Sequence, residues 1–284
     1  MKMEKRVIIA SDSTTDLSPE LIARYDVRIL PLTVGLGDKQ YSDGVDIDPD
    51  MIYAHYEQHQ QLPKTAAPNL AAFLDFFGKL TAEGAEVVCF TISSEMSSTY
   101  QNARIAATEC EGVHVVDTRN LSTGGGLLLV AGAEMAREGL CAAEIAERCR
   151  ALADKVDASF VVDDLEFLHK GGRCSAVAAF GANLLQLKPC ITVCNGKMGV
   201  GKKYRGKFAV VLEKYVQDRL GDGSDIRPSC IFVTHAGCEE SIYLACVERV
   251  KAVLPEANVY VTRAGCTISS HCGRNTLGVL FLHK

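Results

Sequence analysis

Short runs of β-branched and other apolar residues alternate with longer segments of helical periodicity in the first half of the chain. The short runs predict buried strands at 7–9, 27–32, 86–92 and 113–117. The longer segments predict helices at 49–60 and 70–83, one that opens at Pro19, one between 92 and 113, and two between Gly124 and Lys155. Repeated strand–helix–strand units predict a parallel sheet with right-handed crossovers.

Local signals mark the ends of two of these helices. Ser18 is a preferred capping residue, and Pro19 follows it at the first helical position, where its missing N–H is not needed. Asn69 precedes an apolar segment in which Phe residues recur at helical spacing, and Gly84 is expected to end that helix.

The pattern changes after residue 156. Strands are predicted at 159–162, 189–194, 200–204, 230–234 and 258–262, and helices at 208–220 and 239–253. No Pro- or Ser-rich linker separates the two halves. We therefore expect an α/β protein of two lobes, residues 1–156 and a smaller lobe of residues 157–284, that share a large interface with a cleft between them.

The composition is that of an ordinary globular protein, since 48% of the 284 residues are hydrophobic and 23% are charged. The net charge of −5 provides no general attraction for DNA or an anionic membrane. No helix-turn-helix motif or basic stripe is recognised, so a nucleic-acid partner is disfavoured.

The cysteines and the apolar runs indicate the compartment. The 12 Cys residues form no C-x-x-C pair and most lie in apolar runs, which is typical of reduced, buried thiols. The first apolar stretch is too short for a signal peptide, and the longest run, 127–133, is far below the about 20 residues of a membrane-spanning helix. We therefore expect a soluble cytoplasmic protein.

Several enzyme motifs can be tested against the sequence. Residues 196–203 fit most of a phosphate-binding loop, but Lys203 stands where that loop needs Ser or Thr, so a β-hairpin is favoured. No G-x-S-x-G, H-E-x-x-H or G-x-G-x-x-G motif is present. His271 and Cys272 are neighbours that seldom orient each other as base and nucleophile. No catalytic residue is predicted.

The segment 35–50 is polar and acidic. Its carboxylates lack the Gly and Glu spacing of a calcium-binding loop. We expect Asp43, Asp46, Asp48 and Asp50 to lie in a solvated loop and at the start of the next helix, and we predict no metal site and no cofactor.

Hydroxyl-rich turns follow strands at 12–16, 64–68 and 91–100. Such turns lie where open α/β sheets bind ligands. Ser97 and Thr99 would begin a helix, where free N–H groups favour an anion, although Ser and Thr are also ordinary capping residues.

The second half adds two candidates. The pair Gly171-Gly172 permits a tight turn that presents Arg173, whose guanidinium suits a carboxylate or a phosphate. His271 is expected in a polar turn before the last strand.

Together these segments resemble the DegV family of bacterial fatty-acid-binding proteins, in order and over essentially the whole chain. The specific parts are Asp12-Ser13-Thr14, 92–101, 165–173, and His271 with Gly273 and 276–278. The resemblance implies a two-lobed α/β fold that holds a long-chain fatty acid in a tunnel between the lobes. It also implies a partner kinase that phosphorylates the bound carboxylate to an acyl phosphate, a role in phospholipid metabolism, and at most transient membrane contact.

By position, the resemblance assigns Thr65 and Ser97 to contact with the carboxylate, and Arg173 and His271 to the rest of its polar surround. Ser94 is a further candidate. The chain departs from the family pattern at Ala66, Ser98 and Arg274-Asn275. The Ala66 change removes a hydroxyl from the expected site.

The physics of such a ligand agrees with the resemblance. Burial of about 14 methylenes at about 0.8 kcal/mol each offers about 11 kcal/mol before entropic costs, so the tail would supply the affinity. The helix at 70–84 and the segment 177–187 could line the tunnel. The alternative function is a small-molecule phosphotransferase or hydrolase that uses the hydroxyl-rich cleft.

Overall fold

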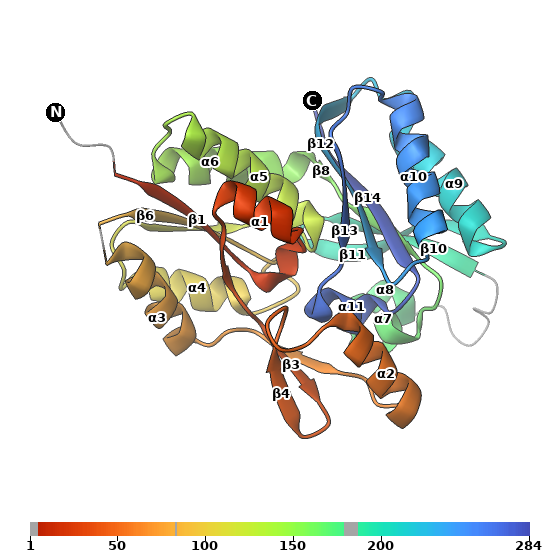
Figure 1. Ribbon diagram of the computed structural model, residues 1–284, viewed down its shortest axis with the longest axis horizontal. Helices are drawn as coiled ribbons and strands as arrows, with labels where there is room; N and C mark the ends of the chain where they lie inside the picture. The colour runs from red at the N-terminus through yellow and green to blue at the C-terminus, as the bar shows by residue number, and fades with distance from the viewer. Residues whose placement is uncertain (1–4, 83, 179–186) are drawn as a thin grey trace.

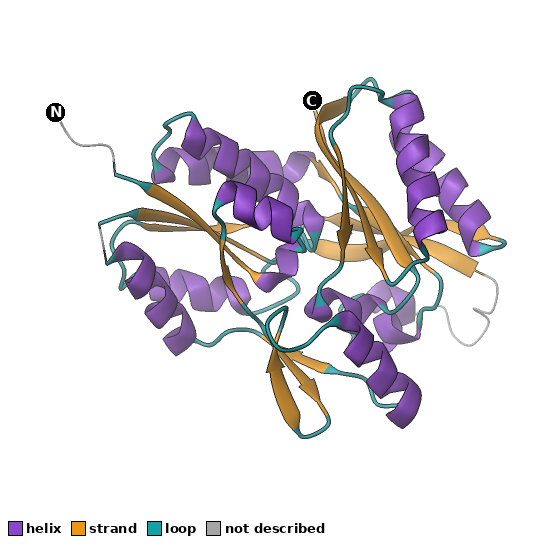
Figure 2. Cartoon of the chain, in the orientation of Figure 1, coloured by secondary structure: helices purple, strands orange, loops and turns teal. Residues whose placement is uncertain are grey.

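The computed structural model describes residues 5–82, 84–178 and 187–284. These residues form three β-sheets (Figure 2). One has the strand order β2-β1-β6-β7, a second has the order β11-β10-β9-β14-β12-β13 with β8 beside β14, and a small one has the order β4-β3-β5. The first sheet lies on the left of Figure 1, the second on the right, and the small sheet below them.

The four-stranded sheet is parallel throughout. Its strands are β1 (Val7–Asp12), β2 (Arg28–Leu30), β6 (Glu86–Thr91) and β7 (Val113–Asp117). Its helices are α1 (Pro19–Tyr25), α3 (Leu70–Thr81), α4 (Thr99–Ala107), α5 (Thr123–Arg137) and α6 (Ala142–Leu152), and short 3-10 turns lie at Ser13–Thr15 and Ala153–Lys155. Ser18 and Asn69 cap α1 and α3 as predicted. The predicted parallel sheet is confirmed.

The second sheet is mixed, because β12 and β13 pair in parallel and its other pairs are antiparallel. Its strands are β8 (Val156–Asp157), β9 (Ser159–Val162), β10 (Leu187–Cys194), β11 (Lys197–Arg205), β12 (Ile226–Ala236), β13 (Val259–Arg263) and β14 (Thr276–His283). Its helices are α7 (Glu166–Gly171), α8 (Ser175–Ala178), α9 (Phe208–Leu220), α10 (Glu240–Val253) and α11 (Cys266–Cys272). A second α/β region is thus confirmed, whereas the division after residue 156 stays a prediction.

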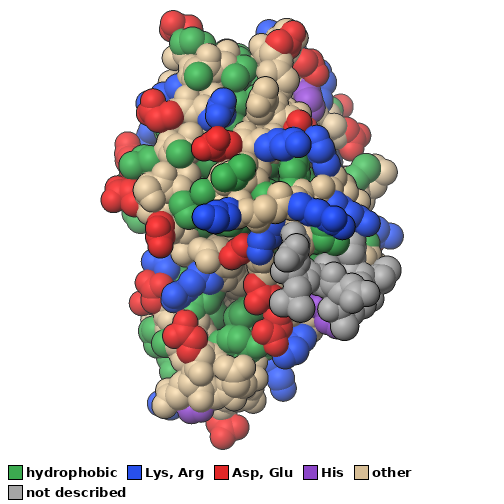
Figure 3. Space-filling view, turned by 90° about the vertical axis from the view of Figure 1, so that its right-hand side faces the viewer, with side chains coloured by type: hydrophobic (Ala, Val, Ile, Leu, Met, Phe, Trp, Pro, Cys, Tyr) green, Lys and Arg blue, Asp and Glu red, His purple; other side chains and the backbone are tan. Residues whose placement is uncertain are grey.

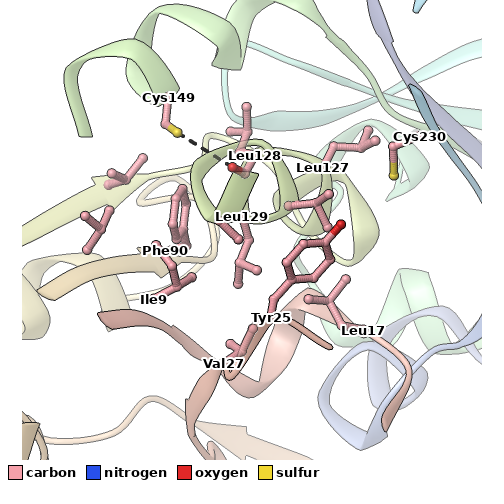
Figure 4. Packing of buried hydrophobic residues seen from close by; sticks show 14 of the residues in the cluster. Ile9, Leu17, Tyr25, Val27, Phe90, Leu127, Leu128, Leu129, Cys149 and Cys230 are labelled. Atoms are coloured by element: carbon pink, nitrogen blue, oxygen red, sulfur yellow. Dashed lines mark hydrogen bonds between the residues drawn. The ribbon is translucent and has the colours of Figure 1, made fainter. Parts of the chain in front are cut away.

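Helix α5 packs against both large sheets. It contacts β1 and β6 on one side and β12 and β14 on the other. Leu127, Leu128 and Leu129 belong to one buried cluster with Phe90 of the parallel sheet and Phe232 of the mixed sheet; Figure 4 shows the three Leu side chains and Phe90. A helix that is apolar on several faces requires cover on each of them. The two large sheets therefore share one hydrophobic core.

The segment 35–50 differs from the prediction. Strands β3 (Thr33–Leu36) and β4 (Lys39–Ser42) form a hairpin, and β5 (Lys64–Ala66) pairs with β3. Asp43 is not in a solvated loop, since its exposed fraction is 4%. Asp48 does cap helix α2 (Pro49–His59), as predicted. The prediction for Asp43 was wrong because the groups that bind its carboxylate are distant in sequence.

Strand β11 is an edge of the mixed sheet and has a cationic surface. Exposed basic side chains lie on it or just after it, at Lys202, Lys203, Arg205 and Lys207. Figure 3 shows a band of Lys and Arg side chains on this side of the molecule. The prediction that the chain has no basic stripe is therefore wrong at this edge strand, although the net charge is −5. Lysines on an edge strand oppose pairing with a strand of another chain.

Strands β10 and β11 form a hairpin whose tip reaches the loop after β6. Cys194 is opposite Lys197, which leaves Asn195 and Gly196 as a two-residue turn with φ of 51° and 81°. Ser93 Oγ donates a hydrogen bond to the carbonyl of Gly196 at 2.7 Å. The predicted hairpin is confirmed, and a phosphate-binding loop at 196–203 is excluded.

Two ionic or polar contacts add to the same junction. Arg119 Nη2 donates to the carbonyl of Asn195 at 2.6 Å, and Lys197 Nζ lies 3.2 Å from Glu95 Oε2. The hairpin of the mixed sheet therefore holds the loop that contains Ser97.

Gly196→Ala tests this junction. A Cβ at residue 196 would lie 2.7 Å from Ser93 Oγ, on a backbone with positive φ. We expect the substitution to lower the free energy of unfolding by about 1 kcal/mol or more in urea titrations. Gly199→Ala on the same hairpin is the control, because nothing lies within 4 Å of its added Cβ. Equal losses in the two variants would contradict the proposed contact.

Candidate functional site

A cavity of about 500 Å³ is lined by residues of the mixed sheet, of β5 in the small sheet, and of the loops that follow β6 and β7 of the parallel sheet. Its volume lies in the range of small-molecule sites. Much of the lining is apolar, and it consists of Leu32, Ile92, Met96, Leu121, Phe160, Leu168, Met198, Ile268 and Leu280. Such a wall suits an apolar ligand or an apolar part of one.

Four of the five residues predicted to bind a carboxylate line this cavity. They are Thr65, Ser97, Arg173 and His271. Ser94 is exposed and is not among the lining residues, and its backbone N–H donates to Asp117 Oδ1 at 3.2 Å. The structure thus brings four of the predicted side chains to one cavity and leaves Ser94 outside it. Their function as ligands stays a prediction.

Thr65 on β5 and His271 on α11 are in direct contact. Thr65 Oγ1 and His271 Nε2 are 2.9 Å apart, although 206 positions separate the residues. Burial, with the nearby positive charge of Arg173, lowers the pKa of His271 to about 4. The imidazole is therefore neutral near pH 7, and its Nε2 either donates a proton to a hydrogen bond or accepts one.

The adjacent glycines of the predicted turn have separate functions. A Cβ on Gly171 would lie 2.7 Å from His271 Nδ1, so helix α7 approaches the imidazole only because residue 171 has no side chain. Gly172 ends α7 with φ of 69°. Arg173 follows with an exposed side chain, whose Nη1 donates to the carbonyl of Gly171 at 2.8 Å. The pair therefore places both His271 and Arg173.

His271 lies on a helix and not in the predicted polar turn. Asp16 Oδ1 accepts the N–H of Gly265 at 2.8 Å, and Asp43 accepts those of Cys266 and Thr267 at 2.8 and 3.1 Å. These carboxylates satisfy free N–H groups at the start of α11, and their negative charge interacts favourably with the positive end of its dipole. The prediction was wrong because the capping groups come from the first 43 residues of the chain and not from the neighbours of α11.

Ser97 lies just before helix α4. Its Oγ accepts the N–H of Thr99 at 3.3 Å and lies 2.8 Å from Thr99 Oγ1. Ser98, the formal N-cap residue, makes no side-chain capping bond. Ser97 thus combines a local capping contact with a place in the cavity wall.

Other predicted elements lie elsewhere. The turn at 12–16 does not line the cavity, and Asp12 accepts N–H groups of Thr14 and Ile92 at 2.9 and 2.8 Å. Helix α3 packs on the parallel sheet through Phe73 and Phe77 and contributes no lining residue. In the segment 177–187, residues 179–186 lie outside the described residues.

The site offers little support for nucleophilic or metal chemistry. Burial raises the pKa of the Cys272 thiol to about 12, so the thiolate is a minor form near pH 7. Within the described ranges, no three His, Cys, Asp or Glu side chains are grouped so as to hold a metal ion.

All 12 cysteines are free, and nine of them are buried. In the same ranges, no helix is long and apolar enough to cross a membrane.

The low pKa of His271 predicts a pH-dependent stability. The unfolded chain takes up a proton near pH 6.5 and the folded chain near pH 4, so the unfolded state binds more protons between these values. The free energy of unfolding is therefore expected to fall as the pH decreases from 6.5 towards 4. Urea titrations should show a shallower fall for His271→Gln. His59→Gln, at an exposed position of α2, is expected to keep the wild-type slope. Equal slopes for the wild type and His271→Gln would contradict this assignment.

Comparisons with known proteins agree with the geometry. A family model described as an uncharacterised protein of the DegV family matches residues 6–284. A DegV domain-containing protein of Clostridium acetobutylicum is 31% identical over 284 residues, which cover 99% of this chain and 100% of the relative.

Solved structures show the same similarity. A DegV family protein of Thermus thermophilus, described for its fatty acid binding, has a TM-score of 0.90 at 29% identity and covers 98% of this chain and 100% of its own. A stearic-acid-binding protein of Eubacterium ventriosum has a TM-score of 0.82 at 28% identity, with coverages of 97% and 98%. The chain therefore belongs to the DegV family.

Proposed function

We propose that this protein binds a long-chain fatty acid, with the alkyl chain in the apolar part of the cavity and the carboxylate against Thr65, Ser97, Arg173 and His271. The observation that supports this most is the convergence of these four side chains on one largely apolar cavity. The relatives from Thermus thermophilus and Eubacterium ventriosum, described as binding a fatty acid and stearic acid, support the same ligand class.

The polar groups differ in what they offer a carboxylate. Thr65, Ser97 and a neutral His271 supply hydrogen bonds, while Arg173 supplies the positive charge. Ala66 lines the cavity with a methyl group where the family pattern has a hydroxyl. The proposed site therefore has one hydrogen-bond donor fewer than the family pattern, and Arg173 becomes correspondingly more important.

Mass spectrometry of the organic extract from freshly purified protein tests this binding. The wild type is expected to contain a stoichiometric C16 to C18 fatty acid. Arg173→Ala should weaken binding about tenfold or more, and Ser97→Ala about fivefold, because one removes a charge-assisted hydrogen bond and the other a neutral one. Ser94→Ala, outside the lining, is the matched control and should retain the lipid. A wild type that repeatedly yields no lipid would refute the proposal.

We further infer that the protein is a cytoplasmic carrier in phospholipid metabolism that has no catalytic group of its own. It would present the carboxylate to a fatty-acid kinase, and residues 1–156 and 157–284 would be the two lobes around the ligand. In the kinase reaction, a carboxylate oxygen attacks the γ-phosphorus of ATP and ADP leaves, so the reactive group belongs to the lipid. The exposed position of Arg173 supports a head group within reach of a second protein.

Incubation of the lipid-loaded protein with a bacterial fatty-acid kinase and ATP tests the second step. Trapping with hydroxylamine should yield an acyl hydroxamate only when both proteins and ATP are present. Arg173→Ala should reduce the yield, and Ser94→Ala should not. The absence of product with a kinase that is active on another carrier would refute the kinase partnership, even where fatty acid binding is intact.

A further inference from the structure

The cavity wall contains hydroxyl groups that an alkyl chain does not need. Ser122, Thr234, Thr267 and Thr276 all line it, and their exposed fractions lie between 4% and 6%. A buried hydroxyl without a hydrogen bond costs free energy, so the partners of each one indicate whether it serves the fold or a ligand.

Three of these hydroxyls are used by the protein itself. Ser122 Oγ donates to Asp16 Oδ2. Thr234 Oγ1 lies 2.5 Å from Thr123 Oγ1 and 2.9 Å from Thr262 Oγ1. Thr276 Oγ1 donates to the carbonyl of Cys272 at 3.0 Å. The Ser122 contact joins the start of α5 to the turn after β1, the Thr234 contacts join α5, β12 and β13, and the Thr276 contact closes the end of α11. Their place in the wall is explained by the fold.

Thr267 differs from the other three. Its Oγ1 is buried and has no hydrogen-bond partner among the described residues. Its backbone N–H donates to Asp43 Oδ2 at 3.1 Å, which satisfies a free N–H group at the start of α11. This bond does not involve the side-chain hydroxyl. Among the described residues of the wall, the fold therefore leaves the Thr267 hydroxyl unpaired, as it does the Nδ1 atoms of His235 and His271.

The position of Thr267 relates it to the proposed head-group site. It precedes His271 by four residues on α11, and residues four apart lie on the same face of a helix, one turn from each other. Threonine in a helix adopts two side-chain rotamers, which exchange the places of its hydroxyl and methyl groups. Both residues line the cavity, so an acyl chain that runs from His271 towards Thr267 would bring its first few carbons to this hydroxyl.

We propose that the cavity selects acyl chains with an oxygen substituent close to the carboxylate, such as a 3-hydroxy or 3-oxo group, to which the Thr267 hydroxyl donates a hydrogen bond. This inference rests on the proposed binding of a fatty acid. A site built to bind an oxygen disfavours the analogue that lacks it, because its own polar group is then left unpaired. Thr267 is thus a specificity-determining residue, while the affinity still comes from the chain.

Isothermal titration of the delipidated protein with hexadecanoate, 3-hydroxyhexadecanoate and 16-hydroxyhexadecanoate tests this selectivity. The wild type should bind the 3-hydroxy acid about fivefold more tightly than hexadecanoate, which corresponds to one neutral hydrogen bond. Thr267→Val should weaken binding of the 3-hydroxy acid about fivefold and leave hexadecanoate unchanged or more tightly bound. Because only the 3-hydroxy acid is expected to bind more weakly, a general loss of structure does not imitate this result.

Thr276→Val is the matched control, since its hydroxyl lines the same cavity but already donates to a carbonyl. It should leave the ratio of the 3-hydroxy acid to hexadecanoate unchanged. The inference is overturned if Thr267→Val leaves that ratio as in the wild type, or if the 16-hydroxy acid responds as the 3-hydroxy acid does. Failure of all three acids to bind the wild type would instead refute the proposed function.

Discussion

Two buried carboxylates determine where the wall of the cavity lies. Asp16 and Asp43 bind the N–H groups at the start of α11, the helix on which both Thr267 and His271 are placed. Burial raises the pKa of Asp16, and the hydrogen bonds from Ser122 and Gly265 counter that effect by stabilising the charged form. Because a helix terminus concentrates several unpaired N–H groups, one carboxylate there orients the whole helix. The chain's first 43 residues thereby position side chains near its end.

The same connection between distant parts appears in the core. Helix α5 is packed between the two large sheets, so separating them would expose a continuous apolar cluster. The hairpin of β10 and β11, whose Met198 also lines the cavity, is held at its tip by polar contacts of Ser93 and Arg119. The Ser93 bond is buried and the Arg119 bond is exposed, and two hydrogen bonds stabilise a structure far less than a continuous apolar core. The cavity is therefore bounded by one strong junction and one weaker junction.

The sequence predicted correctly those features that depend on neighbouring residues, and it failed for features that depend on contacts between distant parts of the chain. The strands of the parallel sheet, the caps at Ser18 and Asn69, and the hairpin over 189–204 follow from residues a few positions apart. Helix α11 and the burial of Asp43 depend on contacts across more than 200 positions, which no local pattern contains. Ser97, Arg173 and His271 were candidates from the sequence itself, and the family resemblance assigned them a carboxylate. Their proximity, as in the bond between Thr65 and His271, required the fold. Ser94 lies in an exposed turn outside the cavity, and its contact with a carboxylate stays a prediction.

The charges around His271 are relevant to the proposed carrier function. Such a carrier must bind a fatty acid tightly and still leave its carboxylate accessible to a kinase. A fully buried carboxylate requires a buried cation, and such a pair is costly to desolvate and to break. Here the partly buried imidazole is neutral, with a pKa of about 4, and the guanidinium of Arg173 is exposed. In the proposed complex the charge is therefore compensated at the surface, while the hydrogen-bonding groups Thr65 and His271 lie deeper. A carboxylate in that position keeps its negative charge and remains within reach of an electrophilic phosphorus, which a fully enclosed ion pair would prevent.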